Sequence, residues 1–228
     1  MGWIEQYRRP VDLPPRIPVF PLRGAILLPR ASLPLNVFEP RYLHMLADVL
    51  AGARLLGILQ PARVDGTLDR ESPAGKSAPL RSIGCVGRVS AYQELDDGRL
   101  AISVTGVARF EVVGEAVTDK PYRILSVSYD RFSRDFSAGL GEEQVDRANL
   151  LAVLKDYLDQ HQLEADWQAI ERASSESLVN SLSVMSPYGA EEKQALLEAP
   201  DLRARAEVLV ALARMELAGT GGAGSTIQ

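Results

Sequence analysis

The sequence predicts an α+β protein in which a β-rich N-terminal part is followed by a helical C-terminal part. Prolines interrupt the apolar runs near the N-terminus, apolar and polar residues alternate around an Asp-Gly pair, and apolar residues recur at helical spacing after about residue 145. The charge changes as well. Residues 1–128 contain 16 Lys and Arg and 13 Asp and Glu, whereas residues 129–228 contain 9 and 17. Such a shift in composition often marks a domain boundary.

These observations predict four segments. We expect a twisted β-sheet or pseudo-barrel with one helix over residues 1–129, ordered from about residue 16, and a linker over 130–142. A helical bundle should follow over 143–218, and the glycine-rich residues 219–228 should form a disordered tail. A chain of 228 residues is long enough for either part to bury a core.

The stretch over residues 17–42 contains apolar runs separated by five prolines, so it cannot be one helix. Proline fixes φ, removes a backbone donor and favours extended geometry in the residue before it. The runs between the prolines therefore predict short strands at residues 17–20, 25–28 and 33–37. Pro40 suits the first turn of a helix, with Glu39 before it as a cap and Gly52 as the stop.

The middle of the chain predicts more strands. A buried strand is expected at 55–60, a polar loop at 61–79, and a further strand at 122–129. Between them, residues 83–95 and 100–113 flank Asp97 and Gly98, a pair suited to a two-residue type I′ hairpin turn. The second arm is long for a flat strand, and we expect Gly106 to let it bend.

Helical spacing dominates the rest of the chain. One apolar stripe runs over residues 145–158, and a second helical region over 167–185 ends at a Ser-Pro-Tyr-Gly sequence. A short helix is expected before Pro200 and a long one over 202–217. These elements make up the predicted bundle.

Composition excludes several classes of protein. The single Cys85 rules out an internal disulfide framework, and no apolar run approaches the roughly 20 residues of a membrane helix. The N-terminus has no apolar core of a secretory signal, so we expect a cytoplasmic protein without membrane contact. His44 and His161 lie in different halves of the chain, and no Cys/His cluster has metal-ligand spacing. We predict no metal site and no cofactor.

Catalytic motifs are missing from the sequence as well. It contains no G-x-x-x-x-G-K-[ST] loop, no G-x-G-x-x-G and no G-x-S-x-G. A Ser–Lys pair would need a desolvated lysine, and all four lysines, Lys76, Lys120, Lys155 and Lys193, are expected in polar or helix-surface positions. We predict no catalytic residue.

The proline-rich stretch is then the best candidate for a functional site. Glu39, Arg41 and Tyr42 have a structural interpretation as a helix cap, an ion-pair partner and a packed aromatic. The functional interpretation is a groove that binds extended apolar peptide by burying area with little sequence demand. Its predicted peptide-binding residues are Leu22, Leu27, Leu28, Leu35, Phe38, Arg41 and Tyr42.

Together, several motifs resemble the N-terminal substrate-binding domain of Lon proteases over about residues 15–217. The resemblance is carried by residues 17–24 (IPVFPLRG), 33–42 (LPLNVFEPRY), 83–89 (IGCVGRV), 97–100 (DGRL), 104–110 (VTGVARF) and 191–198 (EEKQALLE). It implies a PUA-like β lobe followed by a helical bundle, and a role in recognising protein substrates. Because neither the ATPase loop nor the Ser–Lys dyad of that family is present, the chain resembles a stand-alone Lon N-terminal domain, for which a peptidase label would mislead.

Three functions follow as hypotheses. The first is a non-catalytic binding module for unfolded segments or a partner protein, adaptor-like or chaperone-like, with a Lon-type ATPase or protease as a candidate partner. The second is RNA binding through the PUA-like lobe with Arg23 and Arg41, which the acidic charge and the missing basic-aromatic patch disfavour. The third is a hydrolase with an unrecognised site.

Overall fold

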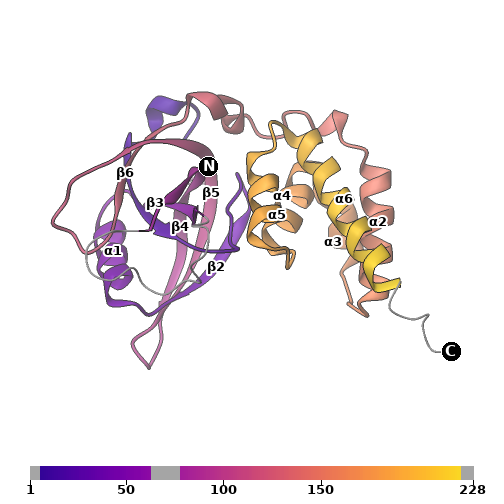
Figure 1. Ribbon diagram of the computed structural model, residues 1–228, viewed down its shortest axis with the longest axis horizontal. Helices are drawn as coiled ribbons and strands as arrows, with labels where there is room; N and C mark the ends of the chain where they lie inside the picture. The colour runs from indigo at the N-terminus through magenta and orange to yellow at the C-terminus, as the bar shows by residue number, and fades with distance from the viewer. Residues whose placement is uncertain (1–5, 63–77, 222–228) are drawn as a thin grey trace.

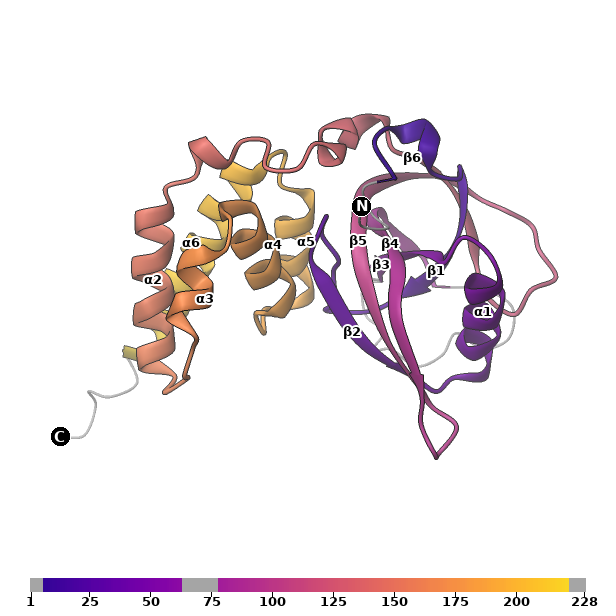
Figure 2. The same ribbon diagram turned by 180° about the vertical axis from the view of Figure 1, so that it is seen from behind.

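A computed structural model gives the structure of the chain and describes residues 6–62 and 78–221. Figure 1 shows a β-rich lobe and a helical lobe side by side. The predicted α+β class is confirmed. The view from behind shows the same arrangement, with one connection running between the lobes (Figure 2). Most of the loop predicted at 61–79 lies outside the described residues.

The β lobe is a sheet that closes on itself. Its strand order is β2-β5-β4-β3-β1-β6, and an additional pairing between β5 and β6 closes the barrel. β1 and β3 are parallel, and the other pairs are antiparallel. The strands are β1 (Arg16–Pro21), β2 (Ser32–Val37), β3 (Leu55–Pro61), β4 (Leu80–Glu94), β5 (Leu100–Glu115) and β6 (Ile124–Ser128), after a 3₁₀ turn η1 (Pro10–Asp12).

β5 is the longest strand and has different partners along its length. Its first half pairs with β2 and its last residues pair with β6, while β4 follows it on the other side. The change falls near Gly106, whose N–H donates to the carbonyl of Ala31 and whose carbonyl accepts from Arg30 N–H. A Cβ on Gly106 would overlap the carbonyl oxygen of Leu28. A glycine is therefore required where the chain before β2 crosses β5.

The β4–β5 hairpin differs from the prediction in its turn. A type I′ turn needs positive φ at both central residues, but Gly98 has a φ of +81° whereas Asp97 is not among the positive-φ residues. Instead Gly98 N–H donates to the Leu95 carbonyl, and Leu95 N–H donates to the Arg99 carbonyl. The turn is therefore a three-residue loop, Asp96-Asp97-Gly98, with the glycine in the left-handed region.

Helix α1 (Pro40–Ala51) has the predicted bounds. Pro40 occupies the first turn and Gly52 follows the last residue. Glu39 is the N-cap residue, but its side chain accepts no capping bond; it binds the guanidinium of Arg41 instead. The helix buries Tyr42, Met45, Leu46 and Val49 against the β lobe.

Residues 25–28, predicted as a strand, form no strand. They begin a largely buried segment, residues 25–31, that crosses β5 and is called the crossing segment below. Ile26, Leu27 and Leu28 are at most 1% exposed, and Pro29 bridges to Gly106. The apolar pattern correctly indicated burial. The prolines and Gly24, which has a φ of +70°, direct the segment into the core rather than along a neighbouring strand.

The helical lobe contains α2 (Arg147–Gln160), α3 (Trp167–Arg172), α4 (Ser175–Met185), α5 (Ala190–Glu198) and α6 (Leu202–Gly221). The region predicted as one helical stretch at 167–185 is two helices. Ser174 separates them because its side chain accepts a hydrogen bond from Ser177 N–H and starts α4. Helix α6 extends to Gly221, so residues 219–221 are helical and not part of a tail; residues 222–228 lie outside the described part.

The segment predicted as a linker, residues 130–142, is packed against the β lobe. It forms the 3₁₀ segment η2 (Asp130–Phe136) and leads into η3 (Glu142–Gln144). Phe132 and Asp135 are buried, and Asp135 binds Arg109 of β5. Asp135 therefore holds the connection between the lobes in place from inside the protein.

The core has two parts. One fills the barrel around Phe110, Ile17 and Leu125. The other runs from α1 through the crossing segment into the helical lobe, where it includes Val179, Leu196 and Leu209. This second part of the core is therefore common to both lobes. Within the described residues, every helix is too short or too polar to span a membrane.

Candidate functional site

Three of the predicted peptide-binding residues are core residues. Leu27 and Leu28 are fully buried, and Tyr42 is 7% exposed with its ring 4.1 Å from that of Phe20. A peptide could not reach these side chains without unpacking the lobe. Leu22 is half-buried beyond the end of β1, where its N–H donates to the Leu59 carbonyl. The structure therefore does not bring all seven predicted residues into one groove.

Leu35, Phe38 and Arg41 do lie at one corner of the β lobe, where β2 ends and α1 begins. Leu35 is half-buried, whereas Phe38 is 65% exposed, unusual for so large an apolar side chain. Arg41 is exposed and donates to Glu39 over 2.9 Å, and its guanidinium lies 4.8 Å from the Tyr42 ring centre. This corner is the part of the prediction that remains accessible.

The β4–β5 hairpin extends the corner. Leu35 faces Ile102 of β5, which faces Tyr92 of β4, so their side chains share one side of the sheet. The middle side chain of this row is buried and its two neighbours are more accessible: Ile102 is 4% exposed, Leu35 is half-buried and Tyr92 is 51% exposed. Leu100, two residues nearer the hairpin turn than Ile102, is also half-buried. We call Leu35, Phe38, Tyr92 and Leu100 the hairpin patch.

Sequence reasoning missed Tyr92 and Leu100, although both belong to the predicted hairpin. The alternation of apolar residues in β5 indicated which residues share a face, but not that β2 pairs beside them. That pairing brings residues more than sixty positions apart into one row. Only the register between β2 and β5 reveals the patch.

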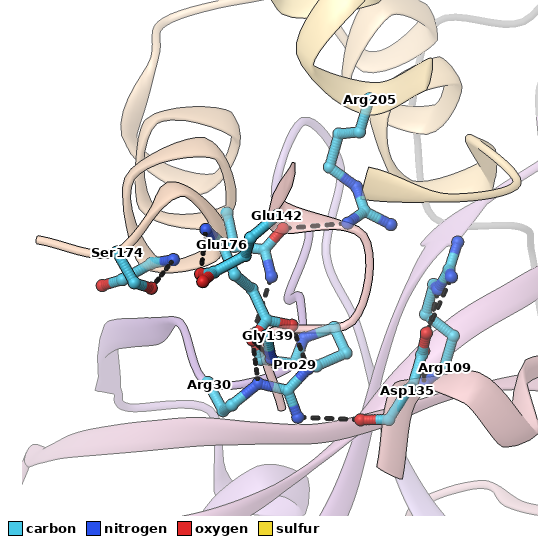
Figure 3. Close-up of polar contacts among 11 residues, drawn as sticks. Pro29, Arg30, Arg109, Asp135, Gly139, Glu142, Ser174, Glu176 and Arg205 are labelled. Atoms are coloured by element: carbon cyan, nitrogen blue, oxygen red, sulfur yellow. Dashed lines mark hydrogen bonds and ion pairs between the residues drawn. The ribbon is translucent and has the colours of Figure 1, made fainter. Parts of the chain in front are cut away.

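The second distinctive region is the polar interface between the lobes (Figure 3). Arg109 of β5 donates to both carboxylate oxygens of Asp135 over 2.8 Å, and also to the carbonyls of Leu197 and Ala199. Arg30 binds Glu176 of α4 and donates to the Asp135 carbonyl. These buried contacts join the crossing segment, the connection and the helical lobe.

Further along the same interface, buried amides replace the charges. Gln60 of β3 donates to the Ala190 carbonyl over 2.8 Å and to Gln194 of α5 over 3.0 Å. Asn180 of α4 donates to the Pro29 carbonyl over 3.0 Å. Gln60, Gln194 and Asn180 are each at most 3% exposed, so these bonds are shielded from water. The interface holds the lobes in one fixed arrangement.

Lys193, expected on a helix surface, is 2% exposed. Its ammonium donates to the carbonyls of Ser183 and Val184, the last turn of α4, and thereby caps that helix. Burial lowers the pKa of Lys193 to about 8. The nearby Ser183 hydroxyl is fully buried and donates to the Val179 carbonyl. This Ser and Lys therefore serve helix structure, and no substrate could reach them.

The remaining reactive groups are also structural. Cys85 is fully buried, and burial raises the pKa of its thiol, so the sulfur stays protonated. Within the described residues, no group of three or more His, Cys, Asp and Glu side chains is placed to hold a metal ion. Several large apolar side chains are exposed among the described residues, and the two aromatic ones in this group, Phe38 and Tyr92, both belong to the hairpin patch.

A family model described as the substrate-binding domain of ATP-dependent protease La (LON) matches residues 16–214. The chain belongs to this family. The matched range includes both lobes and the interface between them, so the Lon substrate-binding domain extends over nearly all of the described structure. The match concerns that domain alone.

Curated relatives agree with this assignment. Lon protease 2 of Myxococcus xanthus is 27% identical over 207 residues, covering 88% of this chain and 24% of the relative. The Lon protease of Flavobacterium johnsoniae is 25% identical over 202 residues, covering 86% of this chain and 23% of the relative. The chain thus spans about a quarter of the length of the Lon proteases it matches.

Solved structures show the same fold. The Lon N-terminal domain protein from Xanthomonas campestris has a TM-score of 0.58 at 21% identity, covering 86% of this chain and 97% of that one. The N-terminal domain of Lon protease from the Mycobacterium avium complex has a TM-score of 0.63 at 19% identity, covering 87% and 98%. A β lobe followed by helices is therefore the architecture of Lon N-terminal domains.

Proposed function

We propose that this Lon substrate-binding domain binds polypeptides through their exposed apolar segments and catalyses no reaction on them. The hairpin patch is the proposed contact surface. The observation that carries the proposal is the row Leu35–Ile102–Tyr92, in which Ile102 is buried in the middle while Leu35 on one side is half-buried and Tyr92 on the other is 51% exposed. Phe38, which directly follows β2, is 65% exposed.

An apolar surface of this kind suits a binder of unfolded chains. Burying apolar area stabilises a complex by about 25 cal/mol per Å² and demands little of the bound sequence. Phe38 and Tyr92 would contribute most because aromatic rings are large and lose few rotamers on binding. The paired charges of Glu39 and Arg41 border the patch and can orient a peptide backbone by hydrogen bonding.

Binding can be measured with fluorescein-labelled β-casein, an unfolded polypeptide, by fluorescence anisotropy. Removal of one anchor from an apolar contact should weaken binding about tenfold, so Phe38→Ser and Tyr92→Ser should each raise Kd by about that factor. Met215→Ser is the matched control, because Met215 is 70% exposed on α6 of the other lobe. Equal loss in all three variants, or no binding by the unmodified protein, would overturn the proposal.

The cellular role we propose is that of an adaptor or chaperone-like factor, with a Lon-type ATPase or protease as the candidate partner. Support comes from the relatives, which are Lon proteases and share this domain. Two measurements test the role separately. The protein should slow aggregation of a thermally unfolded enzyme without ATP, and its addition should change the rate at which a purified Lon protease degrades casein. A rate of degradation unaffected by the protein would exclude the partnership.

A further inference from the structure

A small cavity opens at the meeting point of the crossing segment, the connection and the helical lobe. Its volume is about 40 Å³, and five of its lining side chains are arginines. We call it the lobe cavity. Its inner wall is buried and includes Arg109, Asp135 and Arg205, whereas its mouth includes the exposed Arg134 and Arg203.

The carboxylates that line the cavity already have partners. Asp135 is held by Arg109, and Glu176 is held by Arg30 and accepts from Gly139 N–H over 2.9 Å (Figure 3). Asp201 accepts from Ala204 N–H over 2.8 Å at the start of α6. The lining thus carries five guanidinium groups and three carboxylates, all three of which are engaged.

Arg205 differs from Arg30 and Arg109 because no carboxylate of the described residues is in direct contact with it, although the charges of Asp135 and Glu176 act on it. It is 3% exposed, and it donates only to neutral acceptors: Nε to the Leu196 carbonyl and Nη1 to Asn180 Oδ1, each over 2.9 Å. Among the described residues its Nη2 has no hydrogen-bond acceptor and it forms no ion pair. Desolvation, followed by repulsion from Arg109, lowers the pKa of Arg205 to about 9. A buried charge in this position requires compensation.

We infer that the lobe cavity binds a small oxyanion, of which inorganic phosphate is the representative. The cavity has room for about three water-sized groups, which matches the oxygens that one face of such an ion would present. The ion would accept from Arg205, and the exposed Arg134 would attract it, whereas Arg203 is already paired with Glu207 over 2.8 Å. Because Arg109, Asp135 and Arg205 come from both lobes and the connection, a bound ion would stabilise the interface.

The test is thermal unfolding in sodium phosphate against sodium chloride at equal ionic strength. For a single site, Tm should rise with the logarithm of the phosphate concentration and be about 3–5 °C higher at roughly ten times Kd. Arg205→Gln should abolish the rise, whereas Arg99→Gln should keep it, since Arg99 pairs with Asp97 at the hairpin turn. An equal rise in both variants, or no rise in phosphate beyond that in chloride, would overturn the inference and leave the cavity to water.

A second measurement covers the case in which Arg205→Gln does not fold. In the unmodified protein, the Nε–H resonance of Arg205 should shift with phosphate along a saturable curve, and sodium acetate should compete for the same change. An Arg205 Nε–H chemical shift that does not change with phosphate concentration would contradict the inference. The result is independent of casein binding at the hairpin patch, so failure of one proposal does not decide the other.

Discussion

The hairpin patch exposes aromatic side chains, whereas the lobe interface buries charged ones, and both are contrary to the usual distribution of side chains. At the patch, Phe38 and Tyr92 remain more than half exposed, whereas at the interface Arg109 and Arg205 are almost completely buried. Exposed aromatic area has a free-energy cost that binding can remove, and buried charge has a cost that partners must offset. The two regions therefore require different measurements: peptide binding reports on the patch, and the free energy of unfolding reports on the interface.

The largest expected effect is at the interface. Arg109→Met leaves Asp135 buried without its counter-charge, so the free energy of unfolding should fall by about 3–5 kcal/mol in urea denaturation. Arg99→Met removes an exposed ion pair and should cost less than about 1 kcal/mol. Similar losses of stability in both variants would show that the buried pair of Arg109 and Asp135 matters no more to stability than an exposed pair.

A smaller loss is expected where the crossing segment meets β5. Gly106→Ala should lower the free energy of unfolding by about 2–3 kcal/mol, because the added methyl group overlaps the Leu28 carbonyl. Gly114 lies on the same strand with open space around its Cα. Gly114→Ala should therefore be neutral or stabilising by up to about 1 kcal/mol. If Gly106→Ala proves equally harmless, the crossing segment can move away from β5 at little cost.

Lys193 gives a pH-dependent test of the interface. Its pKa is about 8 in the folded protein and 10.5 ordinarily, so between these values the unfolded chain binds more protons. The contribution of Lys193 to the free energy of unfolding should therefore rise with pH over this window and be lowest below pH 8. Lys193→Met should lower the free energy of unfolding by about 1–2 kcal/mol at pH 7, because it leaves two buried α4 carbonyls without a donor.

Urea denaturation of both proteins at pH 7.5 and 9.5 checks this sign. The difference in stability between the unmodified protein and Lys193→Met should grow with pH. A difference that stays constant would mean that the two carbonyl bonds outweigh burial and keep the ammonium charged in the folded protein.

The smallest effect on stability is expected at the hairpin patch. Phe38→Ser and Tyr92→Ser remove side chains that are already largely in water, so each should change the free energy of unfolding by less than about 0.5 kcal/mol. The same proteins used for casein binding serve for denaturation. A large loss of stability would show that these rings pack inside the lobe in solution, and would join the patch to the core.

Local signals in the sequence predicted much of the fold. Pro40 and Gly52 defined α1 because proline and glycine act on the backbone at their own positions. The alternation in β4 and β5 predicted the hairpin, although the third loop residue was missed. The family resemblance over most of the chain is confirmed by the family match, and the α+β architecture is that of Lon N-terminal domains.

The sequence could not place side chains whose environment comes from distant segments. Leu27 and Leu28 are apolar like groove residues, but they pack where Gly87 and Gly106 leave room beneath β4 and β5. Lys193 is surrounded in sequence by acids and a glutamine, yet it reaches the end of the preceding helix. The buried arginines have no local mark either, because their partners lie tens of residues away.

The shared strand β5 has a consequence for local opening. Its first half is hydrogen-bonded to β2 and its last residues to β6, while Gly106 between them holds the crossing segment. The amides of β2 and β6 are thus protected by one continuous strand and should exchange with deuterium at similar rates, though they lie on opposite sides of the sheet order. A partner that seats on the hairpin should slow amide exchange at β6 as well as at β2.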